Sequence, residues 1–113
     1  GNSESLFATG LKASQTLWQH GFPPEPGRAF RALVKIRLAS PAVPAHIRPM
    51  EDGSIEVIFD TAQRSVSPGQ SVGIYLPLQE AEENSYVFTS PVQREGQTMV
   101  VVGAAIIDAA ITS

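Results

Sequence analysis

The stretch "AHIRPMEDGSIEVIFD", Ala45 to Asp60, decides the fold class, because it places an Asp-Gly pair between two runs of alternating side chains. Asp-Gly between β runs favours a tight hairpin, and we expect a two-residue type I′ turn here. In the second run Ile55, Val57 and Phe59 share one face, as the buried side chains of a strand do. The stretch therefore predicts an antiparallel β-hairpin.

The run before this hairpin contains Pro49, which cannot donate a hydrogen bond to a neighbouring strand. We therefore expect an edge strand or a bulged strand there. Upstream, "AFRALVKIRL" (residues 29–38) also alternates, which predicts a strand with one basic face exposed to water. Phe30, Ala32, Val34, Ile36 and Leu38 point one way, Arg31, Lys35 and Arg37 point the other way, and Leu33 is the exception.

Downstream, "SPGQ" (residues 67–70) precedes the alternating residues Val72, Ile74 and Leu76. Proline fixes φ and glycine tolerates a positive φ, so this tetrapeptide predicts a β-turn that begins a strand. Gln70 has two interpretations. It either caps the turn or, at the mouth of a strand, contacts a ligand.

The flanking segments are less regular. "SLFATGL" suits a strand, and "KASQTLWQ" fits either a helical turn or a second short strand. "GFPPEPG" (residues 21–27) predicts a stiff connector and a domain seam, with Trp18 beside it as a packing anchor. The acidic "QEAEENS" predicts a loop. "YVFTSPV" and "TMVVVGAAII" are further strand candidates, joined by the hairpin signal "REGQ".

Six to eight short strands without a convincing long helix indicate an all-β fold, a barrel or a sandwich. We predict a small antiparallel barrel. Residues 1–27 form its run-in strand and connector, and residues 28–113 form the barrel, with an insertion at about 77–100. The side chains expected inside are Val34, Ile36, Val57, Phe59, Val72, Ile74, Val101 and Ile106.

The composition excludes several kinds of chemistry. With 113 residues the chain is one domain, and the absence of Cys excludes disulfides, thiolate nucleophiles and cysteine-ligated metals. His20 and His46 are too few for a histidine zinc site, so we expect no metal and no cofactor. The chain shows no glycine-rich phosphate loop, no other catalytic motif, no long apolar run and no leader. We expect a cytoplasmic piece of a longer protein, without catalysis of its own or contact with a membrane.

The net charge of -3 is unevenly spread. Residues 28–64 carry six of the eight basic residues against four acids, whereas acids predominate from residue 65 onward. A polyanion would therefore meet the first half of the chain, and the clustering of Arg31, Lys35 and Arg37 makes that strand face a candidate for phosphate contact. Its other interpretation is an ordinary solvated face.

Several motifs occur in an order that resembles the C-terminal barrel of the tRNA-specific 2-thiouridylases. These are "RALVKIR", "VPAHIRP", "EDGSIEVIFD", "AQRSVSPGQSVGIY" and the late "GAAIID". The resemblance implies a Greek-key barrel similar to that of translation elongation factors. It implies as partners tRNA, held near the anticodon, and an N-terminal nucleotide-binding domain. The parent enzyme would be ATP-dependent and would replace the 2-oxygen of the wobble uridine by sulfur, a transferase reaction of tRNA processing.

The resemblance also implies a binding site. In the family's pattern an Arg-Tyr pair and the Gln of Pro-Gly-Gln contact tRNA, and the matching positions here are Arg37, Leu38 and Gln70. Leu38 departs from the family's Tyr. A guanidinium can fork onto a phosphate, and an amide at a turn can donate to and accept from an exposed nucleotide. Lys35 and Arg31 complete the candidate tRNA-binding set.

Two other functions fit parts of the sequence. Flavin-dependent reductase barrels also place "PGQ" before a strand, with an aromatic-Ser/Thr motif soon after, as in "SYVFTSP". A structural or protein-binding barrel would leave the Arg face solvated and present the acidic insertion to a partner.

Overall fold

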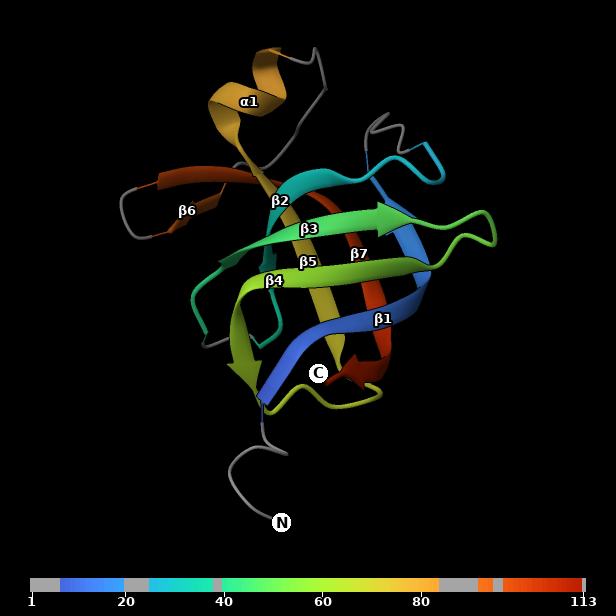
Figure 1. Ribbon diagram of the computed structural model, residues 1–113. Helices are drawn as coiled ribbons and strands as arrows, with labels where there is room; N and C mark the ends of the chain where they lie inside the picture. Colours follow the sequence, from blue (N-terminus) through green and yellow to red (C-terminus); the bar gives the residue numbers. More distant parts are fainter. Residues whose placement is uncertain (1–6, 20–24, 38–39, 84–91, 95–96, 113) are drawn as a thin grey trace.

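The computed structural model describes residues 7–19, 25–37, 40–83, 92–94 and 97–112 (Figure 1). Strands predominate, and one short helix follows the fifth of them. The elements are β1 (Phe7–Trp18), β2 (Phe30–Lys35), β3 (Val43–Pro49), β4 (Ile55–Arg64), β5 (Ser71–Pro77), α1 (Leu78–Glu83), β6 (Val92–Arg94) and β7 (Gln97–Ile111).

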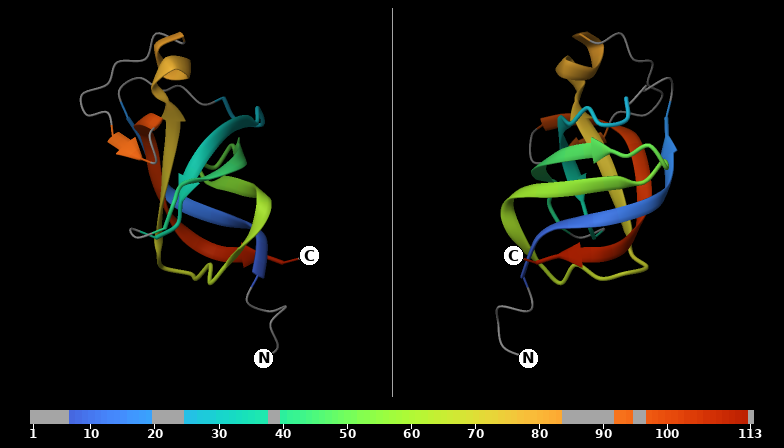
Figure 2. Two further views of the ribbon diagram at one scale, coloured as in Figure 1. Left: turned by 90° about the vertical axis from the view of Figure 1, so that its left-hand side faces the viewer. Right: turned by 45° about the vertical axis from the view of Figure 1, so that its right-hand side comes forward.

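Within the described residues, six strands close into an antiparallel barrel. The sheet order is β1-β4-β3-β2-β5-β7-β6, and a further pairing of β1 with β7 joins the two ends. Figure 2 shows β1 and β7 side by side across this closure. Because β2, β3 and β4 are successive neighbours and β1 lies beside β4, the connection is a Greek key. The predicted all-β barrel is confirmed.

The Asp-Gly hairpin joins β3 to β4 as expected, but its turn is not type I′. Met50 N donates to Ser54 O (2.8 Å) and Gly53 N donates to Met50 O (3.1 Å), while only Gly53 has a positive φ, at 90°. Type I′ requires a positive φ at both central residues, so this is a three-residue loop that ends in a left-handed glycine. Asp52 stabilises it by accepting from Ser54 N at 2.9 Å.

The expectation that Pro49 marks an edge or bulged strand is wrong. β3 lies between β2 and β4 and pairs regularly with both. Pro49 is the last residue of β3, where the ladder ends and its missing N–H leaves no partner unpaired. Its carbonyl accepts from Gly27 N at 2.7 Å, which fastens the Pro-rich connector to this end of the barrel.

The ambiguous first segment is one continuous strand. β1 pairs with β4 along one edge and β7 along the other, and its ladder with β7 shifts between Ser14 and Leu17, where Gln15 has a φ of 53°. Side chains support the closure, because Thr9 Oγ1 donates to Ile111 O (3.2 Å) and Ser14 Oγ donates to Asp108 Oδ1 (3.0 Å).

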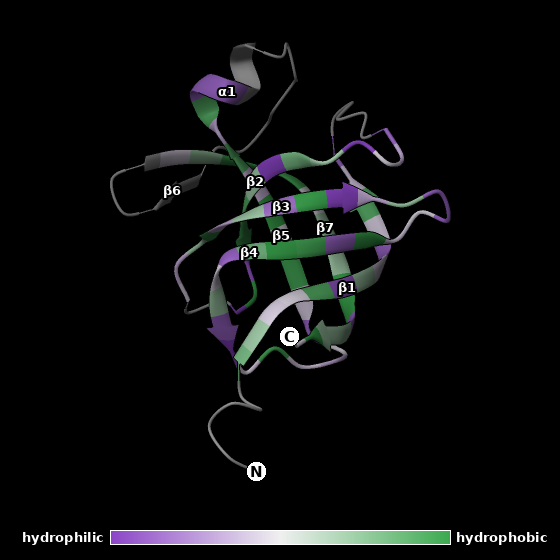
Figure 3. Ribbon diagram, viewed as in Figure 1, coloured by the Kyte–Doolittle hydropathy of each residue, from purple (hydrophilic) through white to green (hydrophobic). Residues whose placement is uncertain are grey.

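The barrel interior is filled by branched apolar side chains, visible as green segments along the strands in Figure 3. Six of the eight residues predicted inside are buried there, but Val101 and Ile106 are only half-buried. A register shift in the β5–β7 ladder places Val100, Val102, Ala105 and Ile107 inside instead. Trp18 is a packing anchor as predicted: it contacts Phe30 edge-on, with ring centroids 6.3 Å apart.

The acidic segment does not form the predicted loop throughout, because residues 78–83 are helical. α1 follows β5 at the upper end of the barrel in Figure 1. β6 pairs with β7 as an antiparallel hairpin, in agreement with the "REGQ" signal. Most of the "YVFTSPV" strand candidate lies outside the described residues.

Candidate functional site

A surface pocket brings together the end of β2 and the start of β5. These two strands are neighbours, and the pairing of Lys35 with Gly73 sets their register. The pocket has a volume of about 400 Å³. We call it the Gln70 pocket, and the residues lining it are Lys35, Ile36, Arg37, Gln70, Ser71, Val72, Gly73, Tyr75 and Ala104. Three of the five site residues predicted from sequence therefore line one pocket.

Gln70 is held in place by its backbone. Ser67 to Gln70 form the predicted turn, with Gly69 at a φ of 89° and Gln70 N donating to Ser67 O (3.4 Å). Gln70 O accepts from Ile107 N, and Gly69 N donates to Ile107 O, both at 2.8 Å. The turn is thus fastened to β7, so the Gln70 side chain begins from a fixed position at the pocket.

The amide oxygen of Gln70 lacks a bonding partner. Among the described residues, Gln70 Oε1 is buried and accepts no hydrogen bond. Buried polar groups in folded proteins are nearly always paired, and an unpaired acceptor costs about 1–3 kcal/mol. A ligand that donates an N–H or O–H to this oxygen would recover that free energy.

Arg37 provides a positive charge at the pocket. Its Nε donates to Ser40 Oγ (3.0 Å) and its Nη1 donates to Arg64 O (3.0 Å). Both acceptors are uncharged, and no salt bridge to Arg37 is found in the described ranges. The guanidinium is therefore oriented without being neutralised, which suits it to bind an anion.

Lys35 does not lie on a solvent-exposed strand face as the alternation predicted, since only 7% of its surface is exposed. Lys35 ends β2, where residues 34–36 are all buried and the alternation breaks down. The long methylene chain of a lysine can be covered while its amine reaches a polar opening. Its place in the lining adds a second cation to the Gln70 pocket.

Tyr75 is the part of the site that the sequence reasoning missed. It lies on β5 two residues after Gly73, on the same outer face. A Cβ at Gly73 would meet Tyr75 Cε1 at 3.0 Å and the hydroxyl at 3.3 Å, so the ring leans back over the glycine toward the Gln70 turn. The available signal was a tyrosine spaced two residues from a glycine just after Pro-Gly-Gln.

Comparison with known proteins gives this barrel a family. Residues 8–84 match the model of the aminomethyltransferase β-barrel domain, which is more than half of the chain. The chain belongs to this family. The Gln70 pocket lies within the matched segment, except for Ala104.

Among relatives of this family barrel are tRNA-specific 2-thiouridylases. The chain is 41% identical over 71 residues to MnmA of Psychromonas ingrahamii, 40% over 73 residues to MnmA 2 of Geobacillus kaustophilus and 44% over 71 residues to MnmA of Haemophilus influenzae. These matches cover 63–65% of this chain but only 18–19% of each relative. The predicted resemblance is confirmed, and the chain spans about a fifth of the relatives' length.

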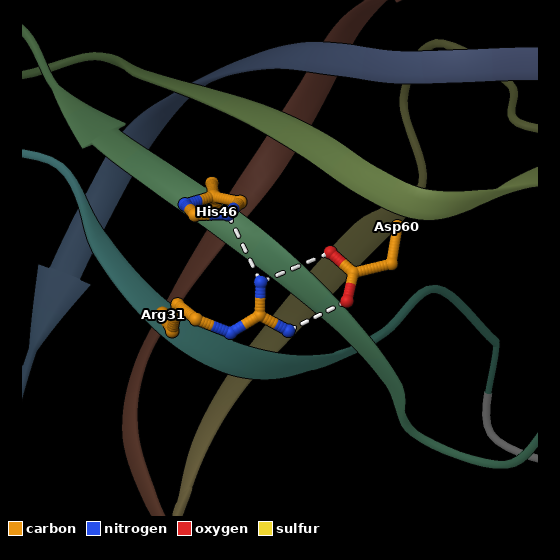
Figure 4. A network of polar contacts seen from close by, with 3 residues as sticks. All are labelled: Arg31, His46 and Asp60. Carbon is orange, nitrogen blue, oxygen red and sulfur yellow. Dashed lines mark hydrogen bonds and ion pairs between the residues drawn. The ribbon is translucent and has the colours of Figure 1, made fainter.

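Arg31, the fourth predicted residue, lies elsewhere on the family barrel. Its guanidinium binds the Asp60 carboxylate twice, at 2.6 and 3.2 Å, and its Nη1 is 2.9 Å from His46 Nε2 (Figure 4). These hydrogen bonds hold the pKa of Asp60 below its ordinary value and raise the pKa of Arg31. Arg31 lines a separate, smaller pocket that includes Glu80 of α1. The three residues of the predicted basic face are therefore divided between two pockets: Lys35 and Arg37 line one, and Arg31 lines the other.

Leu38, the fifth predicted residue, lies outside the described residues. Among the described ranges α1 is the only helix, and its six residues fall far short of the roughly 20 that cross a membrane. The described residues also gather no group of three or more His, Asp or Glu side chains able to hold a metal ion.

Proposed function

We propose that this barrel is the tRNA-contacting module of an enzyme that thiolates the wobble uridine, and that it is not catalytic by itself. Relatives at 40–44% identity are named tRNA-specific 2-thiouridylases. They are about five times the length matched here, so the proposal places ATP use and sulfur transfer in the remaining length, including an N-terminal nucleotide-binding domain. The proposal includes a location in the cytoplasm.

The Gln70 pocket carries this proposal. It combines an unneutralised arginine, a lysine and an unpaired amide acceptor within the segment that matches the family. RNA offers the complementary groups, because phosphates bind cations and unpaired nucleotides present hydrogen-bond donors. Arg31 contributes less, since Asp60 already pairs with it.

The acidic segment does not oppose this role in its described part. α1 follows the last residue of β5, whereas Gln70 immediately precedes the first, so the two lie at opposite ends of that strand. Seven extended residues span roughly 23 Å, about two to three Debye lengths at physiological salt. The carboxylate of Glu80 is thus screened from a phosphate bound at Arg37.

A tRNA titration tests the proposal. Affinity should be weak, and the slope of log K against log salt should correspond to about two to four phosphates. Arg37→Ala should reduce that slope by about one, while Arg37→Lys should retain it. Gln70→Ala should lower affinity without changing the slope, since a neutral amide releases no counterion.

The matched control is Arg28→Ala. Arg28 carries the same charge but lies before the first residue of β2, whereas the pocket adjoins the last. Its side chain is 78% exposed and pairs only loosely with Glu25, at 3.7 Å. Equal losses from Arg28→Ala and Arg37→Ala, or no binding to the parent protein at low salt, would contradict the proposal.

A further inference from the structure

β7 is apolar on both of its faces. From Met99 to Ile107 it has nine consecutive residues without a charged or polar side chain. Val102 and Ile107 point into the core and are buried, whereas Val101 and Ile106 point outward and are half-buried. A strand that meets water on one side normally alternates apolar with polar residues, and a continuous apolar run is typical of a strand buried on both sides. The outer face of β7 therefore has the composition of a covered surface.

The neighbouring strands extend this apolar surface. In the β1–β7 ladder Leu17 lies opposite Ala104, and in the β5–β7 ladder Tyr75 lies opposite Val101. Leu17 is the most exposed large apolar side chain of the described residues, at 71%. We call this three-strand surface the β7 face, and its outward residues are Leu17, Gly73, Tyr75, Val101, Ala104 and Ile106.

The opposite side of the barrel has an ordinary solvated surface. Its outward residues on β3 and β4 include His46, Arg48, Glu56 and Asp60. Figure 3 shows hydrophilic segments on β2, β3 and β4. The charged side chains therefore gather on one side of the barrel and are missing from the β7 face. A contiguous exposed apolar surface on a protein that is polar elsewhere marks an interaction site.

The size of the β7 face indicates what covers it. Three strands spaced about 4.8 Å apart, over the stretch from Val101 to Ile106, present roughly 300 Å². A stable interface between separate proteins needs about 800 Å² from each partner, whereas domains of one chain pack through as little as about 300 Å² a side. A domain on the same chain also meets the face at a high effective concentration, so a small contact is sufficient. The area therefore favours a domain of the same chain over a second copy.

The relatives have the length of chain that this requires. The matched segment makes up 18–19% of each relative, so about four fifths of a relative lies outside it. We infer that the β7 face is the surface on which another domain of the parent chain packs, through an apolar surface of its own. The inference rests on the proposed function for the existence of that domain. The Gln70 pocket adjoins the β7 face at Ala104, so the packed domain borders the pocket.

Hydroxyl-radical footprinting of the full-length parent protein, compared with the 113-residue chain, tests this assignment. Leu17 and Ile106 should be labelled in the 113-residue chain and should lose most of that labelling in the parent. Ile58 is the matched control, because it is an exposed apolar residue (40%) on the charged side of the barrel. Its labelling should be the same in both proteins. Equal labelling of Leu17 in the two proteins would overturn the inference.

Leu17→Lys places a charge at the most exposed point of the β7 face. In the 113-residue chain it should leave the urea midpoint unchanged, because the lysine amine reaches water there. In the parent it should restore the labelling of Ile106 and separate the unfolding of the barrel from that of the rest of the chain. Ile58→Lys should do neither. If Leu17→Lys changes neither the labelling nor the unfolding of the parent, the inference is wrong.

Two further measurements separate the inference from its alternatives. Sedimentation of the 113-residue chain should show a monomer, and a dimer that Leu17→Lys dissociates would assign the β7 face to a second copy and overturn the inference. Protection of Leu17 in a parent protein that does not bind tRNA would remove the proposed function alone. Binding of tRNA through Arg37, with Leu17 fully labelled in the parent, would remove the inference alone.

Discussion

Individual residues here are oriented by the direction of their hydrogen bonds. Arg31 Nη1 lies 2.9 Å from His46 Nε2, and because a guanidinium can only donate, Nε2 is the acceptor of this hydrogen bond. The same guanidinium donates to both carboxylate oxygens of Asp60. These contacts link side chains of β2, β3 and β4 on the outer face of the barrel. Arg37, by contrast, donates its hydrogen bonds to uncharged oxygens. Two arginines six residues apart therefore have different roles, one structural and one available to an anion.

The Asp60 pairing predicts a dependence of stability on pH. Because folding lowers the pKa of Asp60, its ionised form stabilises the folded state above the ordinary pKa of about 4, and that stabilisation is lost as the pH falls through the folded value. Asp60→Asn should therefore lose less stability than the parent between pH 5 and pH 3. Urea midpoints at pH 7, 5 and 3 measure this. Asp108→Asn, which removes a carboxylate that bonds Ser14, is the control.

The site was only partly predictable at this scale. Arg37 and Gln70 stood out because a charge and a turn amide are visible in sequence, and the register of β2 against β5 brings them together. Tyr75 did not stand out, since its ring can lie over Gly73 only because glycine has no side chain there. The burial of Lys35 also depends on packing at the end of β2, which alternation alone cannot show.

At the scale of elements, the sequence correctly predicted the buried face of those strands whose apolar residues alternate with a period of two. The alternating core residues of β2, β4 and β5 lie inside as expected. The errors arose where pairing with a neighbouring strand, and not the local sequence pattern, determines the structure. β3 is central although it contains Pro49, because the proline falls where the ladder ends. The buried face of β7 shifts at an irregularity in its ladder with β5, which no local pattern marks, and so Val101 and Ile106 were misplaced.

The atoms nearest to two glycines predict losses of stability of different size when each glycine is replaced by alanine. A Cβ at Gly10 of β1 would overlap the carbonyl oxygen of Val57 on β4, a backbone atom that cannot swing aside. Gly10→Ala should destabilise the barrel by roughly 1–3 kcal/mol or more. Gly73→Ala meets only the far end of the Tyr75 ring, which can rotate, so its effect should stay below about 1 kcal/mol. Chemical denaturation compares them, and equal losses would contradict this explanation.

At the scale of the whole molecule, closure of the barrel depends on β1. This strand pairs with β4 on one side and β7 on the other, and its Leu11 and Ala13 are fully buried. β1 also precedes the Pro-rich connector, so the chain passes through the expected domain seam between β1 and the other strands of the barrel. Removing it would expose the unpaired edges of both β4 and β7.

We therefore expect a chain of residues 28–113 to fail to fold cooperatively. It would lose two strand ladders and part of the core. We expect this loss to exceed the net stability of a typical domain, which is about 5–15 kcal/mol. Its ¹H–¹⁵N spectrum should show poor dispersion, and it should aggregate through its open edges. Adding a peptide of residues 7–19 should restore dispersion and protect the amides of β4 and β7 from exchange. A well-dispersed spectrum of residues 28–113 alone would instead mean that β4 and β7 close on each other, and that β1 is dispensable.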